Sequence, residues 1–140
     1  MICSIEGSKA TELSSADLRD SLEAGTVSEL QGIARIKFHE GKLDEFERLA
    51  ARCMEIVRAE DTGTLQYDVY FNDDQSECIV LERYTDSAAL IEHATHLGEI
   101  NQAIIATGTV SGALLGEPST ELRAMMAGGE VSLFALYQSM

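Results

Sequence analysis

The sequence predicts a small α+β domain in which an antiparallel sheet carries two helices on one face. The chain has 140 residues, the usual size of one domain, and 45% of them are hydrophobic. Apolar residues recur with the period of a strand in 32–38, 64–72 and 77–84, and helical periodicity follows the first and the third of these runs. Because the loop between the second and third runs is short, these two strands are expected to pair antiparallel.

Residues 1–29 form a polar leader, and residues 30–140 form the domain proper. A hydroxyl of Ser14 or Ser15 can accept the free amides of the first turn of a helix, which predicts a short leader helix that ends at Ala24.

The first strand and the first helix of the domain follow from periodicity. The run 32–38 alternates and places Ala34 and Ile36 on one face, as a strand does. From Leu43 to Val57 the apolar residues recur at steps of three and four, with acidic residues early and basic residues late. This pattern predicts a helix of about four turns.

The register of the hairpin decides which side chains lie beneath the helices. If a five-residue loop sets the register, Val69 lies opposite Ile79. The face beneath the helices then carries Leu65, Tyr67, Val69, Phe71, Ile79 and Leu81. The open face carries Gln66, Asp68, Tyr70, Cys78, Val80, Glu82 and Tyr84. A slip of one residue would bury Glu82 as an unpaired charge, so the first register is preferred.

A second long helix follows the hairpin. Asp86 is its expected N-cap, and His93 lies on the apolar stripe, which can continue through Ile104. The glycine-rich segment 107–120 has no assigned structure.

The end of the chain completes the predicted sheet. Pro118 and Ser119 suggest a helical turn that runs through Met126, and the apolar run 131–138 is expected to be a buried fourth strand. The resulting order, β-α-β-β-α-β, is that of a four-stranded antiparallel sheet with both helices on one face. An open face of mixed character is commonly covered by a second copy, so we expect a homodimer with a small-molecule cavity between sheet and cover.

Composition excludes several classes of protein. The net charge of −14 disfavours binding to nucleic acid or to an anionic membrane. No run of about 20 apolar residues and no signal peptide is evident, so the chain is expected in the cytoplasm. Cys3, Cys53 and Cys78 have no metal-binding or disulfide spacing and are expected to be reduced thiols.

The string GTLQYDVYFNDDQSECIVLERYTDSAALIEH resembles the central motif of the antibiotic biosynthesis monooxygenase family. That motif has a Gly-x-Leu-x-Tyr strand, a short acidic loop, a strand that ends Glu-x-aromatic, and an Asp-capped helix with a His. The matching residues are Gly63, Leu65, Tyr67, Glu82, Tyr84, Asp86 and His93. Tyr84 stands where Trp is frequent in the family, and the leader has no counterpart in its shortest members. The resemblance implies a ferredoxin-like domain that dimerises through its sheet into an α/β barrel.

The resemblance also implies an activity, which is monooxygenation of a small phenol, quinol or anthrone by molecular oxygen without metal, flavin or other cofactor. Such an enzyme needs a base, hydrogen-bond donors for an oxyanion and a dry pocket. Among the expected catalytic residues, His93 is the base and Tyr70 is a donor, a role that Tyr84 can share. Glu82 or Asp68 orients the base or replaces it. The pocket is expected to include Asp68, Tyr84, His96 and Tyr67.

Other interpretations of the same residues stay open. His93 also fits a histidine that only packs between helix and sheet. The pattern EHxxHxxE around it is not the HExxH of zinc enzymes, so no metal is expected. A dimer that binds a small molecule without turnover is the main alternative function. Haem binding or degradation is disfavoured because the chain has no Trp.

Overall fold

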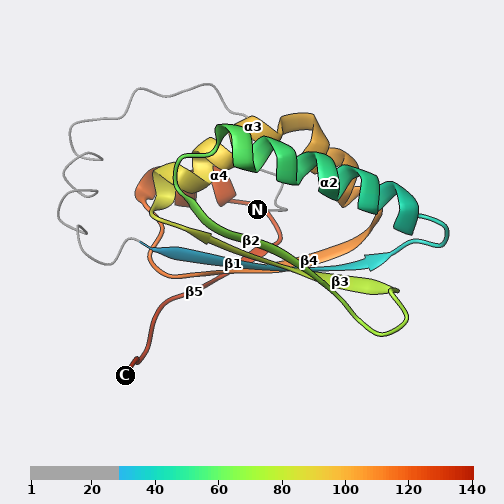
Figure 1. The fold of residues 1–140 in the computed structure, drawn as a ribbon. Coiled ribbons are helices and arrows are strands. Elements are labelled where there is room, and N and C mark those ends of the chain that lie inside the picture. The colour runs from blue at the N-terminus through green and yellow to red at the C-terminus, as the bar shows by residue number, and fades with distance from the viewer. Residues whose placement is uncertain (1–28) are drawn as a thin grey trace.

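The computed structural model describes residues 29–140, so the predicted leader helix lies outside the described part of the chain. A sheet forms one layer, and the helices form a second layer on one of its faces (Figure 1). The elements are β1 (Leu30–Phe38), α2 (Leu43–Glu60), β2 (Thr64–Phe71), β3 (Glu77–Tyr84), α3 (Ser87–Ile105), β4 (Gly108–Leu115), α4 (Thr120–Met126) and β5 (Val131–Phe134). The predicted α+β class is confirmed.

The sheet is five-stranded and mixed, with the order β2-β3-β1-β4-β5. β1 lies between β3 and β4 and pairs antiparallel with β4. β4 lies within residues 107–120, for which the sequence predicts no structure. The prediction of a buried fourth strand over 131–138 is wrong. Only Val131–Phe134 is a strand there, and it lies parallel to β4 at the edge of the sheet, with Phe134 56% exposed. An edge position explains the exposure, because an edge strand has a neighbour on one side alone.

The hairpin register also differs from the prediction by one residue. Val69 pairs with Val80 and Tyr67 pairs with Glu82. The loop explains this register, because the backbone N–H of Asn72 bonds to the Glu77 carbonyl at 3.2 Å, and the Asn72 side chain accepts the Glu77 N–H at 3.0 Å. Asn72 and Glu77 therefore form the last pair of the ladder, and the loop between them is one residue shorter than predicted.

The faces of β3 are therefore exchanged relative to the prediction. The buried side chains of β3 are Cys78, Val80, Glu82 and Tyr84. Ile79 is 40% exposed on the opposite face, which also carries Leu81. The predicted placement of Glu82 and Tyr84 on the open face, and of Ile79 and Leu81 beneath the helices, is wrong. The predicted alternation of β1 is confirmed, and the face that Ala34 and Ile36 share is the buried one.

Both long helices are confirmed, and their ends have physical causes. The Asp86 carboxylate accepts the Ala89 N–H at 2.8 Å and so caps α3. α3 is interrupted at Gly98, whose φ of 43° and ψ of −117° are not helical. The predicted last helix is α4, which Ser119 caps by accepting the Leu122 N–H at 3.1 Å. No helix in residues 29–140 combines the length and apolarity that crossing a bilayer requires.

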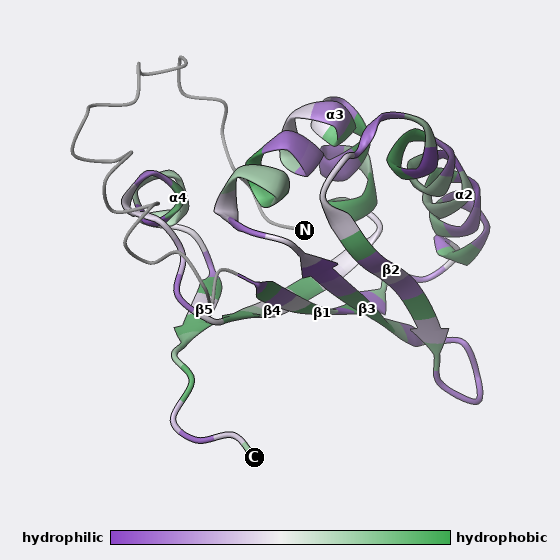
Figure 2. Ribbon diagram, turned by 60° about the vertical axis from the view of Figure 1, so that its left-hand side comes forward, coloured by the Kyte–Doolittle hydropathy of each residue, from purple (hydrophilic) through white to green (hydrophobic). Residues whose placement is uncertain are grey.

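The core has two parts beneath the helical layer. The larger cluster includes Ala34, Ile36, Phe46 and the free thiols Cys53 and Cys78. Burial of Cys78 contradicts its predicted place on the open face and follows from the same change of register. A smaller cluster lies towards α4, which stands above the β4–β5 end of the sheet in Figure 2; its fully buried members are Leu30, Tyr84, Leu90, Leu114 and Leu122. The two clusters bury the same face of the sheet and leave the other face open.

Candidate functional site

A single carboxylate, that of Asp61, joins three side chains beneath the helices. Its Oδ2 accepts a hydrogen bond from Nδ1 of His93 at 2.7 Å and one from the Thr64 hydroxyl at 2.7 Å. Its Oδ1 accepts from Nδ1 of His96 at 2.6 Å. The Asp61 side chain is only 3% exposed, so these bonds replace the water that a carboxylate would otherwise bind.

The chain places Asp61 by ending α2 and packing the next loop tightly. The Asp61 N–H bonds to the Val57 carbonyl at 3.1 Å and so closes the helix. Two residues later, a side chain on Gly63 would place its Cβ 2.5 Å from the Cβ of Ala89 in α3. Only glycine allows this approach, and the Gly63 carbonyl then accepts the Thr85 N–H at 2.9 Å. The loop therefore lies against α3 within reach of its histidines.

His93 is the buried centre of the site. Its side chain has no exposure, and the rings of Tyr67 and Tyr84 lie 5.4 Å and 5.3 Å from its own ring. Its second nitrogen, Nε2, lies 3.8 Å from Oε1 of Glu82, whose side chain is also fully buried. An imidazole, a carboxyl group and two phenols therefore lie close together in the core between sheet and helix.

Burial sets the protonation states of these groups. It lowers the pKa of His93 to about 3, and it raises the pKa of Glu82. Burial also raises the pKa of Tyr67 and of Tyr84 well above the ordinary value, and the nearby Glu82 raises both further. At neutral pH His93 is therefore an uncharged imidazole, and both phenols keep their protons.

Asp61 stays ionised for the opposite reason. Burial alone would raise its pKa, but the hydrogen bonds from His96, Thr64 and His93 outweigh burial and lower it. Since a carboxylate can only accept, both imidazoles use Nδ1 as the donor. The Nε2 atom of His93 then carries the lone pair, lies on the side of Glu82 and is buried without a hydrogen-bond partner among the described residues.

His96 connects the site to the surface. Its side chain is 23% exposed, and its Nε2 lies 3.9 Å from Oε1 of Glu92, which is 32% exposed. The hydrogen bond to Asp61 raises the pKa of His96. Glu92 is itself held by the Thr62 hydroxyl, which donates to it at 2.8 Å.

The structure brings together most of the predicted site residues. Those that meet around Asp61 or next to it are His93, His96, Glu82, Tyr84 and Tyr67. Tyr70 and Asp68 do not join them, because they lie on the opposite face of β2. Asp61 itself was not predicted. One signal in the sequence could have indicated such a residue. His93 and His96 are three residues apart on a largely apolar helix, and buried imidazole N–H groups need a hydrogen-bond acceptor from elsewhere in the chain.

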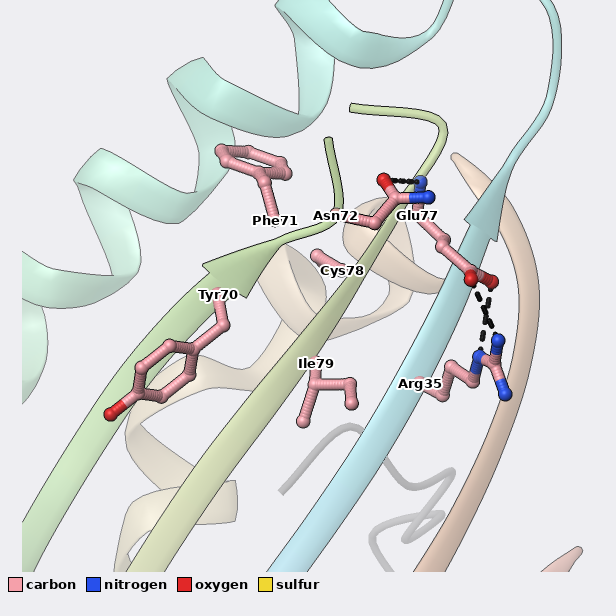
Figure 3. A pocket seen from close by; sticks show the side chains of 7 residues that line it. All are labelled: Arg35, Tyr70, Phe71, Asn72, Glu77, Cys78 and Ile79. Carbon is pink, nitrogen blue, oxygen red and sulfur yellow. Dashed lines mark hydrogen bonds and ion pairs between the residues drawn. The ribbon is translucent and has the colours of Figure 1, made fainter. Parts of the chain in front are cut away.

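A separate pocket of about 270 Å³ lies beside the hairpin loop (Figure 3). Its lining residues are Arg35, Tyr70, Phe71, Asn72, Glu77, Cys78 and Ile79. Arg35 and Glu77 form a bidentate ion pair at 2.6 Å and 3.0 Å, and Tyr70, which is 52% exposed, lies beside Ile79. This pocket is the place where the predicted residue Tyr70 could meet a ligand, away from His93.

The arrangement of elements defines the class of protein as a ferredoxin-like α+β domain. The family model of the antibiotic biosynthesis monooxygenases matches residues 32–102, just over half of the chain. The chain therefore belongs to the antibiotic biosynthesis monooxygenase family.

Solved structures support this fold assignment. MupZ from Pseudomonas fluorescens superposes with a TM-score of 0.69 at 21% identity, over 81% of this chain and 93% of that one. Rv0793 from Mycobacterium tuberculosis has a TM-score of 0.57 at 28% identity, over 64% and 95%. SnoaB from Streptomyces nogalater, a cofactor-independent oxygenase, has a TM-score of 0.55 at 20% identity, over 66% and 96%. Among curated proteins, none matches the chain.

Proposed function

We propose that this protein is a cofactor-independent monooxygenase that acts on a small phenol, quinol or anthrone. The observation that carries the proposal is the buried, uncharged imidazole of His93, held by a carboxylate and faced by two protonated phenols. The family supports an oxygenase, and SnoaB, which shares the fold, is a cofactor-independent oxygenase. We place the reaction in the cytoplasm, where the buried thiols Cys53 and Cys78 stay reduced.

The first step is removal of a proton from the substrate. Nε2 of His93 accepts the proton, and the Asp61 carboxylate on Nδ1 stabilises the imidazolium that forms. The hydroxyls of Tyr67 and Tyr84 keep their protons at neutral pH and can donate hydrogen bonds to the negative charge that develops on the substrate oxygen. Glu82, whose pKa burial raises, can donate in the same way when it is protonated.

The second step needs only oxygen and the electron-rich anion. The anion transfers one electron to O2, and the two radicals combine to form a carbon–oxygen bond in a peroxide. The protonated peroxide then loses water from its C–H and O–O bonds and leaves a carbonyl group. One atom of O2 enters the product and the other becomes water, so the substrate supplies all four electrons. A dry site protects the intermediates from side reactions.

The open face supports the further proposal of a homodimer. It is defined by the side chains of the sheet that point away from the helices; its apolar members include Ile33, Tyr70, Ile79 and Leu81. Beyond β5 the chain continues on this side of the sheet (Figures 1 and 2), with Leu136 63% and Tyr137 96% exposed. A second copy would cover these apolar groups and close the Tyr70 pocket into a cavity at the dimer.

Light scattering during size-exclusion chromatography tests the dimer. The wild type is expected at twice the 15.2 kDa mass of the chain, and Ile79→Lys at the monomer mass, because the substitution places a charge in the apolar contact. Ala51→Lys, on the exposed side of α2, is the matched control and should remain dimeric. A wild-type chain that elutes as a monomer at micromolar concentration would disprove the dimer.

Oxygen uptake by metal-free protein tests the activity. A panel of hydroquinones, naphthols and anthrones is expected to contain at least one substrate that consumes one O2 per molecule of product. Incorporation of one labelled atom from 18O2 would identify a monooxygenase. If compounds of this panel raise the melting temperature of the protein but none causes oxygen uptake, the proposed monooxygenase activity is contradicted. That result would favour a dimer that binds a small molecule without turnover.

A further inference from the structure

We propose that Asp61 is the positioning residue of the buried base, and that His96, which shares the Asp61 carboxylate, tunes the proton affinity of His93 from the surface. The inference rests on the proposed function only for the role of His93 as a base. The coupling between the two histidines is a property of the folded protein and can be measured without substrate.

The geometry forms a continuous line from the core to the surface. The line starts at Glu82 and runs through His93, with 3.8 Å between Oε1 and Nε2. It passes through the two oxygens of Asp61, which lie 2.7 Å and 2.6 Å from the Nδ1 atoms of His93 and His96. It ends at the surface, where Nε2 of His96 faces Glu92 at 3.9 Å. Exposure of the imidazoles rises along this line, from 0% for His93 to 23% for His96.

One carboxylate cannot offset two positive charges. When His96 carries a proton, its charge pairs with the charge of Asp61 and opposes a second proton on His93. When His96 is neutral, the full charge of Asp61 is available to an imidazolium at His93. Burial is the main cause of the lowered pKa of His93; Asp61 raises this pKa and the charge of His96 lowers it.

Other groups face the pair from every neighbouring element. His93 is faced by Glu82 and Tyr84 from β3 and by Tyr67 from β2. His96 is influenced by Glu92 on its own helix and by Glu60 at the end of α2. None of these groups contacts both imidazoles at hydrogen-bond distance, as Asp61 does. Among the described residues, the direct link between the two histidines therefore runs through Asp61.

NMR titration of ring nitrogens and carbons, on 15N- and 13C-labelled full-length protein, tests the coupling between pH 3 and 9. In the wild type, the His93 Nδ1 signal is expected to shift with the same midpoint as the protonation of His96. In His96→Gln this inflection should vanish, and the protonation midpoint of His93 should move to higher pH. In Asp61→Asn the midpoint of His96 should fall, because the carboxylate that stabilises its cation is lost.

Two controls separate tuning from a general structural effect. His39→Gln changes an exposed histidine away from Asp61 and should leave both midpoints unchanged. Asp61→Glu keeps the carboxylate and should restore part of the coupling that Asp61→Asn removes. If His93 has the same midpoint in the wild type and in His96→Gln, the proposal is wrong, even where Asp61→Asn fails to fold. If the midpoints are coupled but no substrate is turned over, the proposed function fails and the tuning stands.

Discussion

The variant His93→Gln is expected to consume oxygen about a hundred to ten thousand times more slowly than the wild type, which is the usual contribution of a positioned general base. Glutamine can still donate to Asp61 and fill much of the space between Tyr67 and Tyr84, but it cannot accept a proton from the substrate. The loss should therefore appear in the rate of turnover with little change in the folded structure.

Tyr70→Phe distinguishes the two places where a substrate could react. Tyr70 lies on the open face and lines the pocket there, so removal of its hydroxyl should leave turnover within a few-fold of the wild type if the reaction occurs at His93. Steady-state oxygen uptake by both variants on one substrate measures the contrast. The reverse pattern, with Tyr70→Phe inactive and His93→Gln active, would move the reaction to the open-face pocket.

The second large effect concerns stability in acid. The pKa of His93 is about 3 in the folded protein and about 6.5 in an unfolded chain, so the unfolded state binds a proton in this interval that the folded state does not. This histidine therefore has no effect on stability above about pH 6.5. Below that, it lowers the free energy of unfolding by about 1.4 kcal/mol for each pH unit, until about pH 3.

Glu82 and Asp61 act over other ranges of pH. Burial raises the pKa of Glu82 in the folded protein. The contribution of Glu82 to stability is therefore full below its pKa in the unfolded chain and is lost as pH rises through its pKa in the folded protein. The pKa of Asp61 is lowered, so its contribution is present above the unfolded value and is lost as pH falls through the folded pKa. The effect of His93 is therefore isolated by a difference between variants and not by the wild-type profile alone.

Urea unfolding of the wild type and of His93→Gln at pH 7.0, 6.0, 5.0 and 4.0 measures this difference. The wild type should be the more stable at pH 7, and its advantage should shrink by about 1.4 kcal/mol per pH unit below pH 6. Glu82→Gln serves as the control that removes the opposing group. A constant difference between wild type and His93→Gln across this range would show that His93 is not held neutral by burial.

Local chemistry made much of the fold predictable. Alternation placed Ala34 and Ile36 on one face, which proves to be the buried one. The N-cap Asp86 and the helical turn after Pro118 could be recognised because both depend on neighbours within a few residues. The strand β4 was missed because Gly108 and Gly112 interrupt its apolar alternation. Gly108 is required there, since a Cβ would lie 2.3 Å from the Lys37 carbonyl oxygen.

Long-range contacts explain what the sequence could not show of the site. Sequence reasoning disfavours the observed register of β2 and β3 because this register buries Glu82 as a charge. Burial raises the pKa of this group and so favours its neutral form, beside the equally buried His93. The role of Asp61 depends on partners 32 and 35 residues away. Its position after a helix looks like that of an ordinary connecting residue until the fold brings α3 against it.

The loop that carries Asp61 also limits how this domain can change. The same carboxylate joins the end of α2, the start of β2 and two positions of α3. It therefore holds three elements together and also positions His93. A substitution that alters basicity at Asp61 must also loosen the attachment of α3. We therefore expect that adaptation to a new working pH would proceed through the exposed partner His96, where charge can change without unfastening the helix.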